Sequence, residues 1–184
     1  TWLMMIIGTV ALTGVGFSFG VLGLLPWDLG FAGFFSKDAI IEGAFMAGRE
    51  GVFFGIPAFW FGVVAALLTS FYSWRLIFMT FHGKPRASSD VMHHAHESPP
   101  VMLVPLFILA VGALLSGVVF KDFFFGDHYE AFWKGALFTG AENQILEEFH
   151  HVPLWVKLSP FVAMLLGLVT AWYFYIRSPE TPKQ

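Results

Sequence analysis

Long apolar runs separated by short polar segments dominate the pattern of this chain. A helix that crosses the hydrocarbon core of a bilayer needs about 20 apolar residues, because each residue adds 1.5 Å. Five stretches reach or approach that length, so the pattern predicts about five membrane spans. Their approximate bounds are residues 3–25, 29–47, 57–81, 101–119 and 154–176. The predicted fold class is an all-α polytopic transmembrane helix bundle, with one of its helices discontinuous.

The connections between these runs differ in length and polarity. Pro26-Trp27-Asp28 interrupts the apolar pattern after the first span, since proline lacks a helix donor and tryptophan favours the membrane interface. Residues 82–100 form a polar loop with three prolines and four histidines. Residues 120–153 are a long connection in which residues 142–151 have a helical composition. We expect one or two short helices there, lying at the interface.

The composition supports a membrane protein over a soluble one. Hydrophobic residues make up 57% of the 184 residues and charged residues only 12%, against about 25% charged in soluble domains. The mean hydropathy is +0.69. A net charge of -3 gives no sign of a nucleic-acid partner. With no cysteine, the chain cannot form a disulfide, a cysteine-ligated zinc site or an iron–sulfur cluster of its own.

Three ionisable residues interrupt the second predicted span: Lys37, Asp38 and Glu42. Ionisable groups cost several kcal/mol in hydrocarbon unless they are paired or hydrated, so they rarely serve stability there. Lys37 lies about nine residues into the span, close to its centre, which favours a functional role over an ion pair at a helix end. Burial disfavours the charged form of a lysine, so we expect Lys37 to gain and lose a proton.

The helical period separates these residues onto two faces. Gly33 and Gly30 lie one and two turns from Lys37 on the same face, and leave space for water or a neighbouring helix. Asp38 and Glu42 share another face, where like charges repel unless one is neutral, hydrated or paired with a cation. Arg75 in the third span is a candidate partner, although its position two turns from the span's end also suits an interfacial anchor.

Histidines and acids in the polar loop raise the question of a metal site. Asp90, His93, His94, His96 and Glu97 lie close in sequence, and the pair His150-His151 lies elsewhere. Neither an HExxH pattern nor a cysteine accompanies them, and the spacing is typical of a solvated loop. We therefore predict no metal site.

Three motifs, in order, resemble one family. Gly30–Asp38, Phe71–Arg86 and His96–Pro100 are similar to the L-type, distal antiporter-like membrane subunit of proton-pumping NADH:quinone oxidoreductase, respiratory complex I. The resemblance runs over essentially the whole chain, which would be the C-terminal part of that membrane domain. Family members usually have Gly-Ile-Pro before the lysine helix, where this chain has Gly16-Phe17-Ser18 and several extra residues.

The resemblance implies roles for four residues. It makes Lys37 the proton-carrying lysine of a broken span, Asp38 its adjacent acid and Arg75 the arginine of the next span; Glu42 is added on position alone. It further implies a translocase subunit whose FMN, iron–sulfur clusters and quinone lie in other subunits. The expected partners are those subunits, above all the M-type neighbour, and the lipid bilayer. A multisubunit Na⁺/H⁺ antiporter subunit is the alternative, since such antiporters share the fold.

The termini and short loops predict location and orientation. The chain starts at Thr1, directly before a predicted span, so we expect it to be part of a longer protein. With five spans, the turn at residues 26–28, the loop of residues 82–100 and the C-terminus would share one side. Lys84, Arg86, Arg177 and Lys183 lie in short segments there, which favours the cytoplasmic side. The sequences of the three motifs resemble bacterial members of the family, so we expect the protein to lie in a bacterial inner membrane.

Overall fold

The computed structural model describes residues 1–17, 29–137, 140 and 152–181. Its helices are α1 (Trp2–Thr13), α2 (Ala32–Arg49), α3 (Gly55–Ile77), α4 (Ser89–His93), α5 (Pro100–Phe125), α6 (Tyr129–Trp133) and α8 (Leu154–Trp172). Two π-helical turns, η1 (Phe78–His82) and η3 (Tyr173–Arg177), extend α3 and α8. The strands β1 (Gly16–Phe17) and β2 (Leu29–Gly30) form a two-residue antiparallel pair. The predicted all-α class is therefore confirmed, with this small ladder as an addition.

Three helices of the described part are long and apolar enough to cross a membrane: Gly55–His82, Pro100–Phe124 and Leu154–Arg177. They correspond to the third, fourth and fifth predicted spans. The fourth continues beyond the predicted end at residue 119 as far as Phe125, so it includes two charged residues, Lys121 and Asp122.

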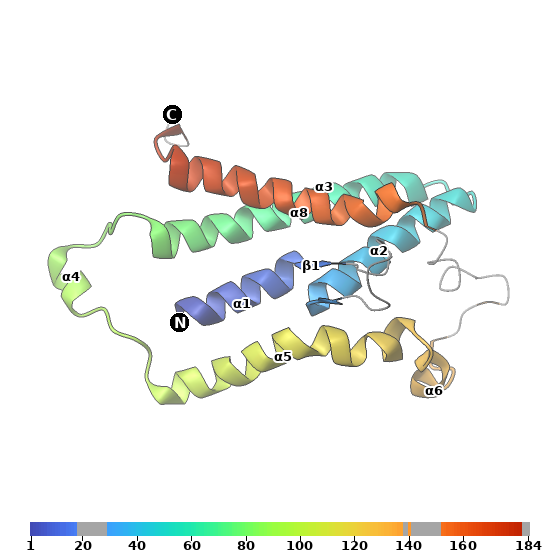
Figure 1. The fold of residues 1–184 in the computed structure, drawn as a ribbon, viewed down its shortest axis with the longest axis horizontal. Coiled ribbons are helices and arrows are strands. Elements are labelled where there is room, and N and C mark those ends of the chain that lie inside the picture. Colours follow the sequence, from blue (N-terminus) through green and yellow to red (C-terminus); the bar gives the residue numbers. More distant parts are fainter. Residues whose placement is uncertain (18–28, 138–139, 141–151, 182–184) are drawn as a thin grey trace.

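The prediction of one continuous helix over residues 3–25 is wrong. Helix α1 ends at Thr13, where Gly14 takes a left-handed conformation with φ of 77°. Helix α2 follows α1 along the long axis of the molecule (Figure 1), so the two traverse it as one discontinuous helix. At 1.5 Å per residue, α1 is about 18 Å long and α2 about 27 Å. The two together match the length of α3 with η1.

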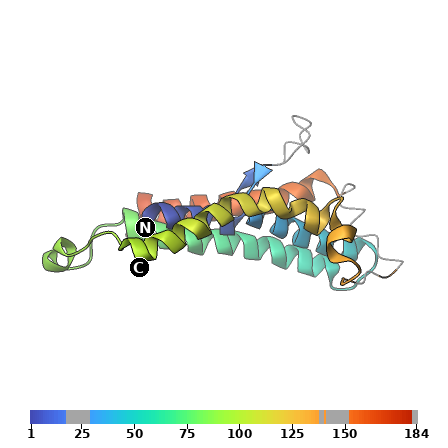
Figure 2. The same cartoon turned by 90° about the horizontal axis from the view of Figure 1, so that it is seen from below.

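This arrangement changes the predicted topology. The junction of α1 and α2 lies midway along the molecule and not at one of its ends (Figure 1). As predicted, α4 and the end of η3 share one end of the molecule, and the N-terminus lies there too (Figures 1 and 2). The predicted turn at residues 26–28 is outside the described residues.

Helices α3 and α8 pack against each other in parallel and form, with α2, the main core. The Ser70 hydroxyl of α3 donates a 2.7 Å hydrogen bond to the Met164 carbonyl of α8. Nearby, a Cβ on Gly167 would come within 2.5 Å of the Leu67 carbonyl oxygen, so the two backbones meet closely. Small residues permit such approaches between membrane helices. Further along, Phe45 of α2 packs edge-on against Phe59 of α3.

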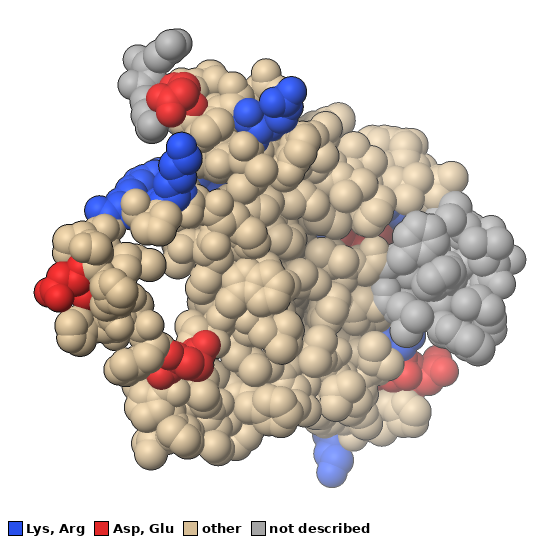
Figure 3. All heavy atoms as spheres, turned by 60° about the vertical axis from the view of Figure 1, so that its left-hand side comes forward, with Lys and Arg blue, Asp and Glu red and all other residues tan. Residues whose placement is uncertain are grey.

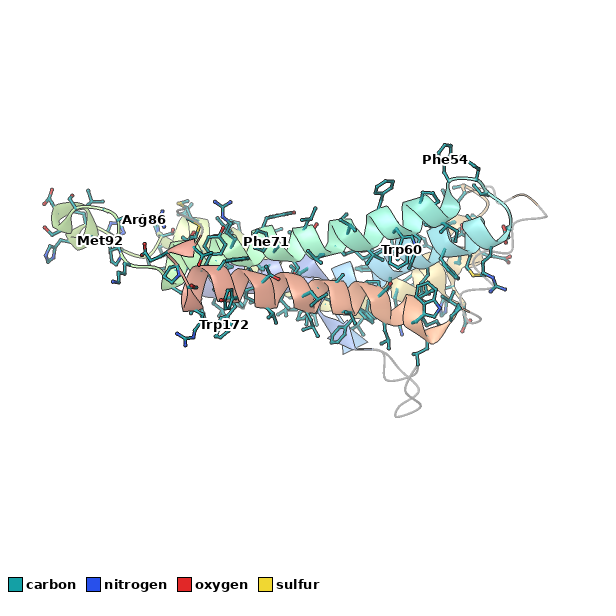
Figure 4. All side chains as sticks on the ribbon, turned by 90° about the horizontal axis from the view of Figure 1, so that it is seen from above. Phe54, Trp60, Phe71, Arg86, Met92 and Trp172 are labelled. Atoms are coloured by element: carbon teal, nitrogen blue, oxygen red, sulfur yellow. The ribbon has the colours of Figure 1, made fainter. Side chains whose placement is uncertain are left out.

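Apolar side chains cover most of the molecular surface. On α5 large residues such as Val101 and Leu109 are 83% and 69% exposed. Charged residues lie around the margins of a broad uncharged face in Figure 3. Trp60 lies toward one end of α3, and Trp172 lies toward the opposite end of the molecule, nearer Arg86 (Figure 4). This distribution fits a protein surrounded by lipid and other membrane helices.

The long connection of residues 120–153 is described in part. Its beginning belongs to α5, and Tyr129–Trp133 forms the short helix α6, in line with the one or two short helices expected in this connection. Residues 142–151, for which the composition predicts a helix, lie outside the described residues.

Candidate functional site

The break between α1 and α2 leaves backbone carbonyls in the middle of the molecule. The last four carbonyls of an α-helix have no partner within the helix. At the end of α1, the Gly14 and Val15 amides both donate to the Val10 carbonyl oxygen. The Leu12 carbonyl oxygen instead accepts a 2.6 Å hydrogen bond from the Nζ of Lys37. A cation at this place also complements the negative end of the helix dipole.

Close backbone contact holds Lys37 at this helix end. A Cβ on Gly33 would lie 2.1 Å from the Ala11 carbonyl oxygen, so only glycine lets the first turn of α2 approach α1. The Phe31 amide donates to the Val15 carbonyl oxygen at 3.2 Å. The space beside Lys37 at Gly33 was predicted to admit water or a neighbouring helix; the end of α1 occupies it.

Phe34 fixes the junction from its other side. The side chain is 7% exposed. Gly16 and Gly30, which are paired across the β1–β2 ladder, both lie against its ring: a Cβ on either would come within 2.4 Å of ring atoms. Gly30 therefore belongs to this ladder and not to the helix face of Lys37 on which the sequence places it.

Two threonines continue the polar character of the junction into α1. Thr9 and Thr13 are buried, and the Thr13 hydroxyl donates to the Thr9 carbonyl oxygen at 2.8 Å. The end of α1 that Lys37 reaches thus includes a buried hydroxyl, Thr13, next in sequence to the Leu12 carbonyl that Lys37 bonds. Discontinuous helices of this kind form the ion sites of many membrane transporters, near the bilayer midplane.

Asp38 and Glu42 lie on a different face of α2 from Lys37, although Asp38 still interacts electrostatically with the adjacent Lys37. Both side chains are half-buried. Turning about 100° per residue, α2 brings positions 35, 38 and 42 within about 60° of one another. This shared face is called the acidic face of α2 below.

The structure does not bring Arg75 to the acidic face. Antiparallel pairing of α2 with α3 sets Ile41 beside Gly62 and Phe45 beside Phe59, which places Lys37 level with about residue 66. Arg75 therefore lies about 13 Å further along α3. Its guanidinium lies 5.5 Å from the ring centroid of Tyr175 in η3, and its side chain is exposed. The contact fits the interfacial anchor that was the other interpretation of Arg75.

Lys121 of α5 is near the junction and is not among the site residues predicted from the sequence. Its Nζ lies 5.6 Å from the ring centroid of Phe35, which belongs to the acidic face. Four residues earlier, a Cβ on Gly117 would come within 2.7 Å of the Ala32 amide nitrogen, so α5 meets the first turn of α2 closely. The sequence feature that could have identified Lys121 is the triplet Phe123-Phe124-Phe125, which follows the two charged residues and indicates that the helix continues past them.

The histidine-rich loop shows no built site. Within the described residues, no group of three or more His, Asp or Glu side chains could hold a metal ion. The His94 Nδ1 lies 3.9 Å from an Asp90 carboxylate oxygen, and both side chains are over 80% exposed. The pair His150-His151 is outside the described residues.

A family described as NADH dehydrogenase subunit 5 C-terminus matches residues 72–135. NADH-quinone oxidoreductase subunit L of Rhodobacter capsulatus is 38% identical over an alignment that covers 99% of this chain and 32% of that protein. F(420)H(2) dehydrogenase subunit L of Methanosarcina mazei is 40% identical over 93% of this chain and 25% of its own length. NADH-ubiquinone oxidoreductase chain 5 of Mycosarcoma maydis is 37% identical over an alignment that covers 95% of this chain and 25% of that protein. The chain thus spans between a quarter and a third of these relatives.

Proposed function

Because this chain belongs to the L-type subunit family of NADH-quinone oxidoreductases and matches its C-terminal part, we propose that it translocates protons across a membrane with Lys37 as the carrier. The observation that supports the proposal most is the hydrogen bond from Lys37 to the open end of α1. It places one basic side chain at the break of a discontinuous helix, where both a charged and a neutral amine have a partner.

The chemistry at this position is a reversible proton transfer. As an ammonium, Lys37 donates to the Leu12 carbonyl oxygen and is favoured by the negative helix end. As a neutral amine it keeps an N–H for the same oxygen and gains a lone pair that accepts a proton. The apolar surroundings disfavour the ammonium. Two opposed influences on one group allow a nearby change of charge to decide whether the proton stays or leaves.

Electron transfer would occur outside this chain. The chain has no cysteine to hold an iron–sulfur cluster. Its relatives belong to dehydrogenases that are named for different electron donors, NADH and F(420)H(2). We propose that FMN, iron–sulfur clusters and quinone are held by partner subunits, and that quinone reduction there drives the charge changes. An M-type antiporter-like subunit is the proposed neighbour. The proposed location is a bacterial inner membrane, with η3 and α4 toward the cytoplasm.

The proposal is tested in proteoliposomes that contain the complete complex. We expect Lys37→Ala to lower NADH-driven acidification of the lumen, with complex assembly retained. The matched control is Lys84→Ala in the exposed loop between α3 and α4, which should pump normally. Normal pumping by Lys37→Ala would exclude Lys37 as the carrier.

A Na⁺/H⁺ antiporter subunit is the alternative function, and purification separates the two. NADH dehydrogenase subunits should accompany a tagged form of the chain if it belongs to the redox complex. Cation-driven proton exchange without these subunits would instead support the antiporter.

A further inference from the structure

Lys121 lies where a second charge could act on the proton path. It sits four residues before the end of α5, and α5 runs parallel to α2, from the contact of Gly117 with Ala32 to that of Lys121 with Phe35. Its side chain is half-buried although it belongs to one of the most apolar helices of the chain. A lysine side chain within a membrane helix costs free energy, so its presence indicates a functional role.

The contact with Phe35 sets the ammonium on the acidic face of α2. Asp38 lies one turn and Glu42 two turns beyond Phe35, both within about 60° of it around the helix. Lysine reaches its neighbours through a flexible four-carbon stem, so one turn of α2 is within its range. Lys37 leaves α2 on a different face and bonds to α1.

We propose that Lys121 is the positioning cation of the acidic face: it holds Asp38 and Glu42 in their charged form, and so prepares them to take up the proton that Lys37 releases. This inference rests on the proposed function. Lys121 thereby takes the role of charge partner that was predicted for Arg75, which lies about 13 Å further along α3. The proton would leave toward the end of the molecule at α6.

Other charges near α2 define the comparison variants. Helix α1 has no titratable side chain, and α3 has Tyr72 and Arg75, both beyond the part that pairs with α2. Helix α5 contributes Asp122 as well as Lys121, and α8 contributes Lys157, two residues after the Trp155 that packs on Phe45. Three other cations compete with Lys121. Lys37 interacts electrostatically with its neighbour Asp38, and Arg49 lies two turns beyond Glu42 on the acidic face of α2. Lys157 is the third, while Lys134 is an exposed lysine beyond α6.

The test measures carboxyl protonation by infrared spectroscopy of the assembled complex, as the carbonyl band of protonated acids against pH. Asp38→Asn and Glu42→Gln assign the band. Removing a nearby cation favours the protonated acid, so in Lys121→Met and Lys121→Gln the band should persist to higher pH by about one unit. The low-pH limb of NADH-driven pumping should move the same way. Lys121→Arg keeps the charge and should restore the parent behaviour, and Lys134→Met should leave both measurements unchanged.

Three results would overturn the assignment of Lys121: no shift in either Lys121 variant, a shift with Lys157→Met or Arg49→Met instead, or equal shifts in all variants including Lys134→Met. The proposed function fails separately. If Lys37→Ala abolishes pumping while the Lys121 variants show no shift, only the role of Lys121 is wrong. If Lys37→Ala pumps normally, the function itself is wrong, whatever the infrared band shows.

Discussion

Substituting Gly33 by alanine should separate Lys37 from α1 without unfolding the bundle. The new Cβ would lie 2.1 Å from the Ala11 carbonyl oxygen, whereas ordinary contact begins at 3.4 Å. The first turn of α2 must therefore retreat by about 1.3 Å, because the atom it meets is backbone. Such a retreat would lengthen the bond from Lys37 to the Leu12 carbonyl oxygen from 2.6 Å to beyond hydrogen-bond range.

Helix propensity acts in the opposite direction and keeps the helix intact. Gly33 lies in the first turn of α2, so alanine gains less than the about 1 kcal/mol that it gains over glycine in a helix interior, against an overpacking cost of about 1–3 kcal/mol. Stability should therefore fall by no more than about 3 kcal/mol, while the position of Lys37 changes.

The assay compares NADH-driven proton pumping with thermal stability for Gly33→Ala and for a control, Gly8→Ala. Gly8 lies on α1 with nothing within 4 Å of an added Cβ. We expect Gly33→Ala to remain folded and pump less, and Gly8→Ala to match the parent. Full pumping by Gly33→Ala would refute the claim that the helix-end contact matters.

Three further variants probe the packing around the site. Ser70→Ala removes a buried hydrogen bond to the Met164 carbonyl and should cost about 1 kcal/mol in denaturant unfolding, with Ser70→Thr as the comparison; no loss would contradict the role of the bond. Gly117→Leu should push α5 from α2, lowering the thermal midpoint and the pumping rate together, and an unchanged midpoint would contradict the close approach. Arg75→Gln should weaken the contact with Tyr175 by about 0.5–1 kcal/mol but pump far better than Lys37→Ala; equal loss of pumping would restore Arg75 to the proton path.

Apolar length was sufficient to predict α3, α5 and α8, since a run of that length has few alternatives in a membrane protein. The same signal failed for residues 3–25, because glycine counts as apolar in a hydropathy pattern even where its conformation ends a helix. Gly14 at φ of 77° is such a glycine. Only the contact with Gly33 shows that the helix must stop there.

The site was predictable in its central residue but not in its surroundings. Lys37 and the separate face of Asp38 and Glu42 follow from composition and helical period. The partner of Lys37 is a backbone carbonyl 25 positions away, and no side-chain pattern reveals a backbone acceptor. Lys121 was missed because adjacent charges usually mark a helix end, whereas α5 continues to Phe125.

The number of protons translocated per NADH oxidised is the decisive measurement for Lys37 as the proton carrier. It should be measured in proteoliposomes for the parent complex and for Lys37→Ala, with electron transfer recorded in the same sample. We expect a lower ratio in Lys37→Ala while its NADH oxidation continues. An unchanged ratio at full NADH oxidation would contradict it, because the subunit would then move its protons without Lys37.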